Sequence, residues 1–203
     1  MSISQQDRER ISTAIRAAEA KTSGEIVCVL AQSSSDTTAL PILVAAVIAL
    51  ALPWLLVAFT AMPVHRILLL QVVAFFALAA VLCHPRARIA LVPRAARRSV
   101  AHRVAMEQFH IRGIARKKDR TGILIFVSLA ERYARIIADE GIAARMPQSE
   151  WQGAVDALVA HMRGGRIADG FITAIEVCGK VLETNFPRTE TSRDQLPDRI
   201  YLI

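Results

Sequence analysis

Three acidic residues stand where the chain would bring carboxylate oxygens together. Asp119 precedes the apolar run from Gly122 to Leu129, and Asp139 and Glu140 follow the run from Tyr133 to Ala138. Both runs have the composition of buried strands, and the short connection between them suits an antiparallel hairpin, which would place the three carboxylates at one edge of a sheet. Grouped carboxylates bind hard cations such as Mg²⁺ or Ca²⁺, and a bridging cation polarises a phosphoryl group. These residues are therefore candidate metal ligands of a phosphatase; the alternative is that they are solvated acids that offset nearby arginines.

The motifs of other hydrolytic mechanisms do not occur in the sequence. No cysteine is followed six positions later by arginine, and there is no Asp-x-Asp pair, Gly-x-Ser-x-Gly turn or Gly-x-x-x-x-Gly-Lys phosphate loop. His102 and His110 share a predicted helix but have no neighbours at zinc-site spacing, so we expect surface histidines. Cys28, Cys83 and Cys178 have apolar neighbours and are expected to be free thiols. No catalytic residue can be named from motifs.

Two uncharged apolar stretches, Ala39 to Met62 and Ile67 to Cys83, follow one another closely. As helices they would reach about 36 and about 25 Å, compared with a hydrocarbon core of about 30 Å. Apolar side chains fill every face of the first stretch, whereas a core helix of a soluble protein would show a polar stripe. The sequence therefore predicts a transmembrane helical hairpin over residues 39–84, in preference to buried core helices or a cleaved signal peptide.

A strongly basic segment follows the hairpin. From His84 to Arg120 the chain has eleven Lys or Arg residues and two acids, compared with a net charge of +7 for all 203 residues. Basic residues beside a span stay in the cytoplasm, which predicts a two-pass protein of the plasma (inner) membrane with both termini cytoplasmic. The first arginines of the segment are expected to form a collar against anionic lipid head groups: Arg86, Arg88, Arg94, Arg97 and Arg98. Nucleic acid is the lesser alternative and is not expected as a partner, because Phe109 is the one aromatic residue in the segment.

The flanks of the hairpin are predicted to fold together as one discontinuous domain of residues 1–38 and 85–203. Its fold class is α/β, with a small mixed sheet of three or four strands covered by helices and interrupted by the hairpin. Strands are expected over residues 25–31, 122–129 and 133–138, with a further strand within 196–203. The first two strands are joined through the hairpin and a helix, which suits a parallel crossover.

Four helices are expected to cover this sheet. They begin at a Ser4 cap, at Pro93, at a capping box formed by Ser149 and Gln152, and near Ile167. In the second of them, residues 93–112, the apolar face is predicted to comprise Val100, Val104 and Ile111, together with Ala101 and Ala105.

Three segments resemble a known family. They read AEAKTSGEIVCVLA from Ala18, RTGILIFVSLAERYARIIADEGI from Arg120 and ADGFITAIEVCGKVLETNFP from Ala168. They resemble the TPM domain, which is known from a thylakoid lumen protein, a photosystem repair factor and a MOLO-type modulator of acetylcholine receptors. The chain is most similar to bacterial TPM-domain membrane proteins in which two spans follow the first strand of the domain. The resemblance implies either a phosphatase, for which metal assistance is one option, or an accessory factor in assembly, repair or signalling.

The chain departs from the TPM pattern at the candidate ligands. Typical TPM domains carry an acidic residue and Asn just before the second strand and Gly-Tyr-Gly-Leu-Glu after the third, whereas here Arg120 follows Asp119, and Asp139 and Glu140 replace the start of the second motif. An arginine beside an acidic cluster weakens cation binding. We therefore expect a cytoplasmic module for protein interaction or membrane quality control, with an unidentified protein partner. The alternative is a weak metal-dependent phosphatase acting on phosphoesters, with Mg²⁺ or Ca²⁺ as its cofactor.

Overall fold

A computed structural model of the chain describes residues 3–34, 39–84, 93–116, 120–188 and 196–203. The chain divides into two compact units, one formed by Met1–Ser34 with Val100–Ile203 and the other by Ser35–Ser99. The first unit contains a sheet and its covering helices. The second contains two long apolar helices.

The first unit is built on a four-stranded mixed sheet. Its strands are β1 (Glu25–Ala31), β2 (Gly122–Ser128), β3 (Tyr133–Ala138) and β4 (Ile200–Leu202), in the order β3-β2-β1-β4. β1 pairs in parallel with both β2 and β4, and β2 pairs antiparallel with β3. This arrangement confirms the predicted crossover, the predicted hairpin and the α/β fold class. Every residue of β1 and β2 is buried, as expected for central strands covered on both faces.

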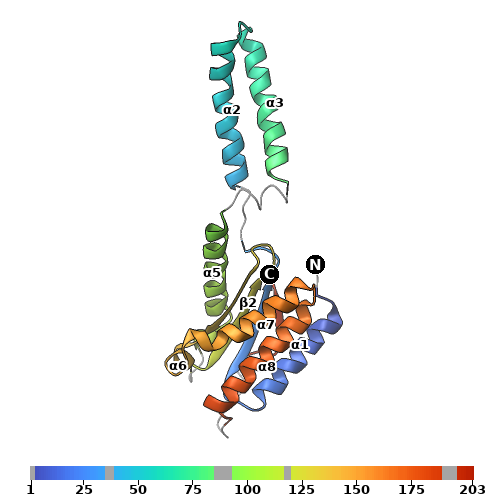
Figure 1. The fold of residues 1–203 in the computed structure, drawn as a ribbon, viewed down its shortest axis with the longest axis vertical. Helices are drawn as coiled ribbons and strands as arrows, with labels where there is room; N and C mark the ends of the chain where they lie inside the picture. The colour runs from blue at the N-terminus through green and yellow to red at the C-terminus, as the bar shows by residue number, and fades with distance from the viewer. Residues whose placement is uncertain (1–2, 35–38, 85–92, 117–119, 189–195) are drawn as a thin grey trace. The chain divides into compact units, whose positions relative to one another are not determined.

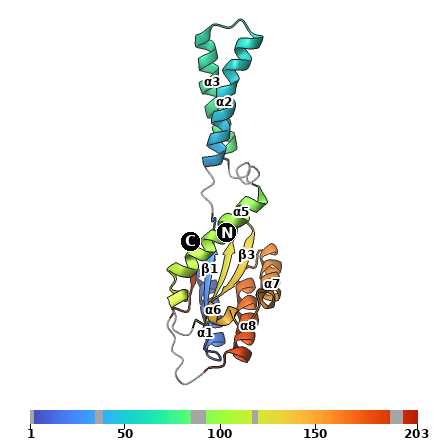
Figure 2. The ribbon, with the colours of Figure 1, turned by 90° about the vertical axis from the view of Figure 1, so that its left-hand side faces the viewer.

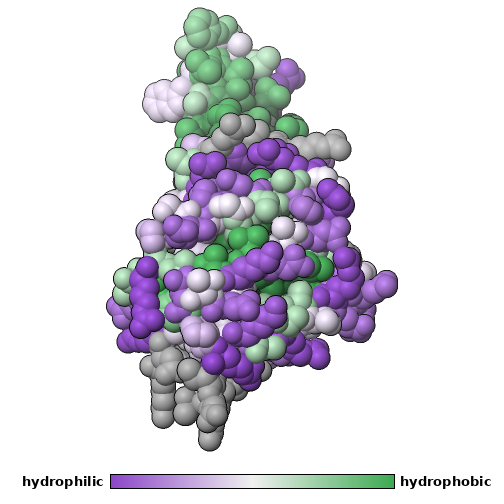
Figure 3. Space-filling view, turned by 60° about the horizontal axis from the view of Figure 1, so that its bottom comes forward, coloured by the Kyte–Doolittle hydropathy of each residue, from purple (hydrophilic) through white to green (hydrophobic). Residues whose placement is uncertain are grey.

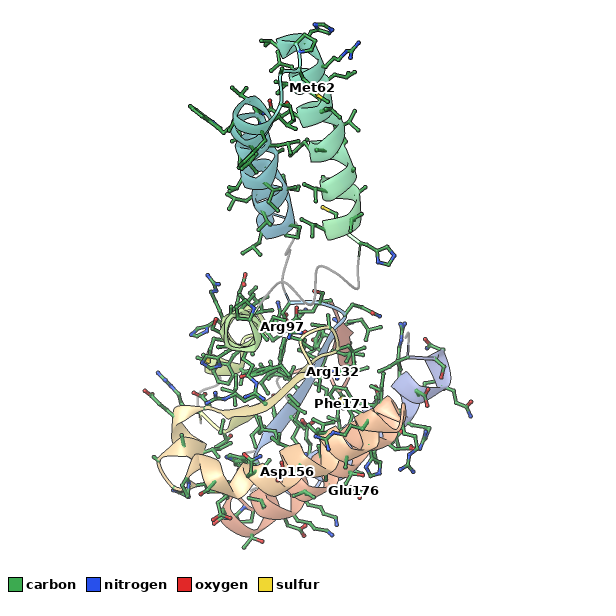
Figure 4. The ribbon with its side chains drawn as sticks, turned by 45° about the horizontal axis from the view of Figure 1, so that its top comes forward. Met62, Arg97, Arg132, Asp156, Phe171 and Glu176 are labelled. Carbon is green, nitrogen blue, oxygen red and sulfur yellow. The ribbon has the colours of Figure 1, made fainter. Side chains whose placement is uncertain are left out.

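Three helices cover one face of the sheet: α1 (Gln5–Glu19), α7 (Gln152–Arg163) and α8 (Ile167–Asn185). Figure 1 shows them side by side in front of the strands. Alternate strand residues such as Cys28 and Ile125 pack against fully buried helix residues such as Ile15 and Phe171. Phe171 lies on the side of α8 that faces the sheet (Figure 4). Burying each large apolar side chain contributes about 1.5–3 kcal/mol. This layer buries more of them than the opposite face does, so it is the main core.

The opposite face is covered by α5 (Arg94–Ile111), followed by the short helix η1 (Ile114–Arg116) (Figure 2). Ala101 and Ala105 are fully buried, as predicted, and Phe109 completes the stripe. Ile111 is 61% exposed, so its predicted inward position is wrong. Ala101, Ala105 and Phe109 follow one another at four-residue intervals, so they lie on one face of the helix, and Ile111 lies outside that face.

Helix starts were predicted with mixed success. Ser4 caps α1, because its hydroxyl accepts a hydrogen bond from the Asp7 backbone N–H at 3.1 Å. The Ser149 capping box is wrong, because a short helix η2 (Gln148–Trp151) runs directly into α7 and Trp151 occupies the cap position without a side-chain hydrogen bond. A four-residue helix, α6 (Glu140–Ala143), follows β3.

The second unit is a helical hairpin of α2 (Ala39–Phe59) and α3 (Val64–Leu82). Both helices are long and apolar enough to cross a membrane, with mean hydropathies of 2.8 and 2.1. The helices pack through small side chains, including the buried Ala45 and Ala49. Figure 3 shows the mostly hydrophobic surface of this unit, and Figure 4 shows Met62 at its turn.

Candidate functional site

The predicted acidic cluster lies where β1 and β2 begin and β3 ends. Glu25 stands opposite Gly122 in the parallel pair, and the Asp139 backbone N–H donates to the Gly122 carbonyl at 2.9 Å. The Thr121 hydroxyl donates to the Ser23 carbonyl at 3.1 Å, and the Glu25 N–H donates to the Thr121 carbonyl at 3.1 Å. Three segments that are distant in sequence are thereby joined at one sheet edge.

Asp139 is the buried acid of this edge, with 4% of its surface exposed. Its Oδ1 atom accepts a hydrogen bond from the Glu140 backbone N–H at 2.7 Å and caps α6. Its Oδ2 atom is buried without a hydrogen-bond partner among the described residues. An unpartnered buried carboxylate oxygen is unfavourable, so this atom is where a cation would be accommodated.

The Glu140 side chain is exposed and pairs with an arginine. Its Oε2 atom lies 2.6 Å from Nη1 of Arg120, in an exposed ion pair. Arg120 adopts a positive φ of 50°, which turns the chain into β2. The arginine that departs from the TPM pattern therefore neutralises one of the three predicted ligands. Asp119 lies outside the described residues.

An apolar side chain lies over Gly122, the residue between Glu25 and Asp139 in the sheet. The two residues flank Gly122 across three neighbouring strands, and a Cβ at position 122 would lie 2.4 Å from Cγ2 of Ile114. Ile114 is fully buried there. Within the described residues, no group of three His, Cys, Asp or Glu side chains is arranged to hold a metal ion.

The start of β1 is tied to the end of α8, a contact that the sequence motifs did not indicate. The Thr22 hydroxyl and the Ser23 backbone N–H both donate to the Phe186 carbonyl, and the Gly24 N–H donates to the Thr22 hydroxyl at 3.0 Å. A Cβ at Gly24 would lie 2.9 Å from Leu182 of α8. The Thr-Ser-Gly opening therefore has a structural role at this position.

A second polar cluster, also missed from the sequence, lies at the opposite end of the sheet. The Glu131 carboxylate accepts hydrogen bonds from the Ser34 backbone N–H at 3.0 Å and the Ser33 hydroxyl at 3.2 Å, and a third from Ser128. Glu131 belongs to the turn between β2 and β3, and Ser33 and Ser34 directly follow β1. The cluster holds the chain where it leaves the sheet towards α2.

The buried thiols are unsuited to nucleophilic chemistry. Burial raises the pKa of Cys178 to about 12. Burial also raises the pKa of Cys28 well above its ordinary value, with further contributions from Cys178 and Glu19. Because the thiolate is the nucleophile, neither side chain is activated at neutral pH.

The sequence model of the TPM domain matches residues 83–181. The protein contains a TPM domain. The match includes α5, all of β2 and β3, and Asp139, whereas β1 and Glu25 lie outside the matched residues.

A solved structure supports the fold of this TPM domain. The NMR structure of the BA42 protein from the psychrophilic bacterium Bizionia argentinensis has a TM-score of 0.63 to this chain and is 20% identical to it, over 100% of this chain and 96% of that chain. At this identity the likeness concerns the fold alone. No curated protein matches the chain.

The residues of the predicted basic collar differ in their surroundings. Arg98 is exposed, whereas Arg97 on α5 is half-buried and its Nε atom has no hydrogen-bond partner among the described residues (Figure 4). Arg94 begins α5, and Arg86 and Arg88 lie outside the described residues.

Proposed function

We propose that this protein is a membrane-anchored TPM-domain protein whose domain faces the cytoplasm and serves as a non-catalytic interaction module in membrane quality control or assembly. One observation carries the anchoring: only 11% and 6% of the most apolar windows of α2 and α3 are buried within the protein. A core helix of a soluble protein would be mostly buried. Side chains this apolar need another apolar surrounding, which lipid provides.

The cytoplasmic orientation rests on charge. The ionisable side chains of residues 39–84 lie at the ends of the helices: His65 and Arg66 at the start of α3, and Cys83 and His84 directly after it. The basic segment begins with Arg86. Basic side chains near a span remain on the cytoplasmic side and attract anionic head groups. The exposed Arg98 is suited to this contact, and Arg86, Arg88 and Arg94 are proposed to share it.

Membrane extraction and reporter fusions test the anchoring and its direction. The full-length protein is expected to stay in the membrane pellet after a sodium carbonate wash and to be released by detergent. Fluorescent reporters at either terminus should be active in the cytoplasm, and an alkaline phosphatase inserted near Val64 should be active outside. Release by carbonate would contradict the anchor, and an inactive phosphatase with active termini would contradict the orientation.

The non-catalytic assignment rests on the sheet edge. The apolar Ile114 lies over Gly122, next to the positions of Glu25 and Asp139, and Arg120 pairs with Glu140. Both contacts oppose a cation centre at this edge. An interaction role uses the fold without requiring such a centre.

The second candidate function is a weak metal-dependent phosphatase, favoured by the buried Oδ2 atom of Asp139 that has no partner among the described residues. Asp119, Asp139 and Glu140 would be its ligands and Mg²⁺ or Ca²⁺ its cofactor. Calorimetry with each cation and hydrolysis of p-nitrophenyl phosphate test it in the full-length protein. Cation binding and turnover that are both lost in Asp139→Ala would establish the phosphatase, whereas the absence of both would exclude it.

A further inference from the structure

The last strand of the sheet has an open edge. β4 (Ile200–Leu202) lies at the end of the strand order, so only one of its sides pairs with a described strand, β1. The Ile203 N–H donates to the Leu30 carbonyl at 3.0 Å, and the Ile203 carbonyl accepts from Gln32 at 2.9 Å. Because backbone groups alternate in direction along a strand, the N–H and C=O of Leu202 point away from β1. They form a free template for another strand.

A groove of about 830 Å³ runs along this edge. Tyr201 and Leu202 both line it, although neighbouring strand residues point to opposite faces, so the groove follows the edge itself and not one face of the sheet. One wall is a face of α1, from Gln5 to Arg16. That face is about 17 Å long at the helical rise, which matches about five residues of extended chain.

The groove is basic. Four arginines line it, and Glu9 is its one acidic lining residue; the arginines are Arg8, Arg16, Arg112 and Arg199. Among the ion pairs of the described residues, Arg16 alone of these four takes part, at 3.7 Å from Asp198. Arg112 donates from Nε to the Gln108 side chain at 3.1 Å, and no ion pair among the described residues involves Arg8, Arg112 or Arg199.

Two of the arginines are held in place by an aromatic ring. The guanidinium carbon of Arg112 lies 3.9 Å from the centroid of Tyr201, and that of Arg199 lies 4.8 Å from it. Cation–π contact restrains both side chains before any ligand binds. Preordered guanidinium groups lose less entropy on binding and are suited to bidentate contact with carboxylates.

From these observations we infer that an acidic, extended segment of a partner protein binds along β4 as an additional strand. Its backbone pairs with the free N–H and C=O of Leu202, and its carboxylates on alternate sides face α1 and the Arg112–Tyr201–Arg199 cluster. Strand addition of this kind takes affinity from the backbone and specificity from the side chains. The inference deepens the proposed interaction role by naming its surface and ligand chemistry, and it is independent of the membrane anchor.

The full-length protein in dodecyl maltoside is titrated into a fluorescein-labelled peptide, Glu-Glu-Val-Val-Glu-Glu, and anisotropy is measured. Adjacent glutamates of an extended peptide point to opposite sides, as the inference requires. Saturable binding is expected, weakened about tenfold or more in a protein carrying both Arg8→Glu and Arg199→Glu. The matched control carries Arg163→Glu and Lys180→Glu, which make the same change in charge at exposed positions of α7 and α8, outside the groove. The control is expected to bind like the wild type. Equal weakening in both variants would overturn the inference.

Two substitutions separate strand pairing from simple charge attraction. Replacing both adjacent valines of the peptide by proline keeps its charge but removes one backbone donor on each side of the strand. Leu202→Pro removes only an outward N–H of β4, which an edge strand tolerates. Each change is expected to weaken binding about tenfold or more. The peptide change requires no altered protein, so it remains decisive if Leu202→Pro fails to fold. Undiminished binding of the proline peptide, or equal binding of an oligothymidylate, would show a general polyanion surface and overturn the inference. A protein that resists carbonate extraction but does not bind the peptide would contradict this inference alone.

Discussion

The side chain of Ile114 occupies the space above Gly122, with its Cγ2 atom 2.4 Å from the point where a Cβ at position 122 would lie. Because any larger side chain at position 122 would overlap with Ile114, the contact requires glycine as the first residue of β2. It also places an apolar side chain over Gly122, whose backbone neighbours on either side are Glu25 and Asp139.

Gly122→Ala is expected to destabilise the protein, because the new methyl group forces a fully buried side chain and its strand to shift. Overpacking of this kind costs about 1–3 kcal/mol. Urea unfolding of the detergent-solubilised protein, followed by circular dichroism, measures the change in the free energy of unfolding.

Gly153→Ala is the control for this change. Gly153 lies in α7, and nothing stands within 4 Å of its added Cβ. Alanine is the better helix former by about 1 kcal/mol, so stability should be unchanged or increased. If both glycine variants behaved alike, the contact with Ile114 would not be the reason for glycine at position 122.

Asp139→Asn is expected to be better tolerated than Asp139→Ala. Asparagine retains an oxygen that accepts the Glu140 N–H and caps α6, and it removes a buried charge. Alanine loses the cap, at a cost of about 1 kcal/mol. Thermal unfolding of the two variants in chelator-treated buffer makes the comparison. A larger loss in the asparagine variant would mean that the ionised carboxylate itself is needed.

Acidification is expected to weaken the start of α1. The hydrogen bond from the Ser4 hydroxyl, followed by Arg10, lowers the pKa of Asp7 below its ordinary value of 3.8. A lowered pKa means that the folded state favours the ionised carboxylate, so this stabilisation is present at neutral pH and is lost as the pH falls below about 3.8 and through the folded-state pKa. NMR titration should place the Asp7 pKa closer to its ordinary value in Ser4→Ala. An unchanged pKa would mean that the hydroxyl has no part in the effect.

The three thiols are expected to differ in reactivity. Cys28 and Cys178 are buried and Cys83 is partly exposed. Because burial raises the pKa of Cys178 to about 12 and that of Cys28 in the same direction, both thiols remain protonated in the native protein. In detergent at neutral pH, N-ethylmaleimide should modify Cys83 first, and the other two only after unfolding in urea. Mass spectrometry of the digested protein checks the order, and early labelling of Cys178 would indicate opening of the main core.

A loss of stability at high pH should follow from the same two thiols. A thiol with a raised folded-state pKa favours folding while it is protonated, and that contribution falls once the pH exceeds the ordinary thiol value near 9 and approaches 12. Cys178→Ala should reduce the slope of stability against pH in this range relative to the wild type. Equal slopes would assign the alkaline loss to other groups.

The periodicity of the chain was sufficient for most of the fold. The ranges predicted for β1 and β3 agree with the structure to the residue, and that for β2 differs by one. Each strand is rich in apolar residues and is bounded by clear turn residues, although β3 includes Arg135. The two apolar helices were equally recognisable as long apolar stretches. On α5 the pattern was ambiguous: two possible apolar stripes share the helix, and only contact with the sheet decided for Phe109 over Ile111.

By itself, the sequence determined which segments are strands and helices, because that choice depends on local periodicity. It also placed Asp139 and Glu140 directly after β3, where the structure has them. Only the tertiary structure decided what those acids face. Three contacts form only when the chain folds and brings their residues together. They are Ile114 with Gly122, Arg120 with Glu140, and the Thr22 hydroxyl with the Phe186 carbonyl. The same holds for the basic groove at β4, because its arginines come from three separate segments that only packing brings together.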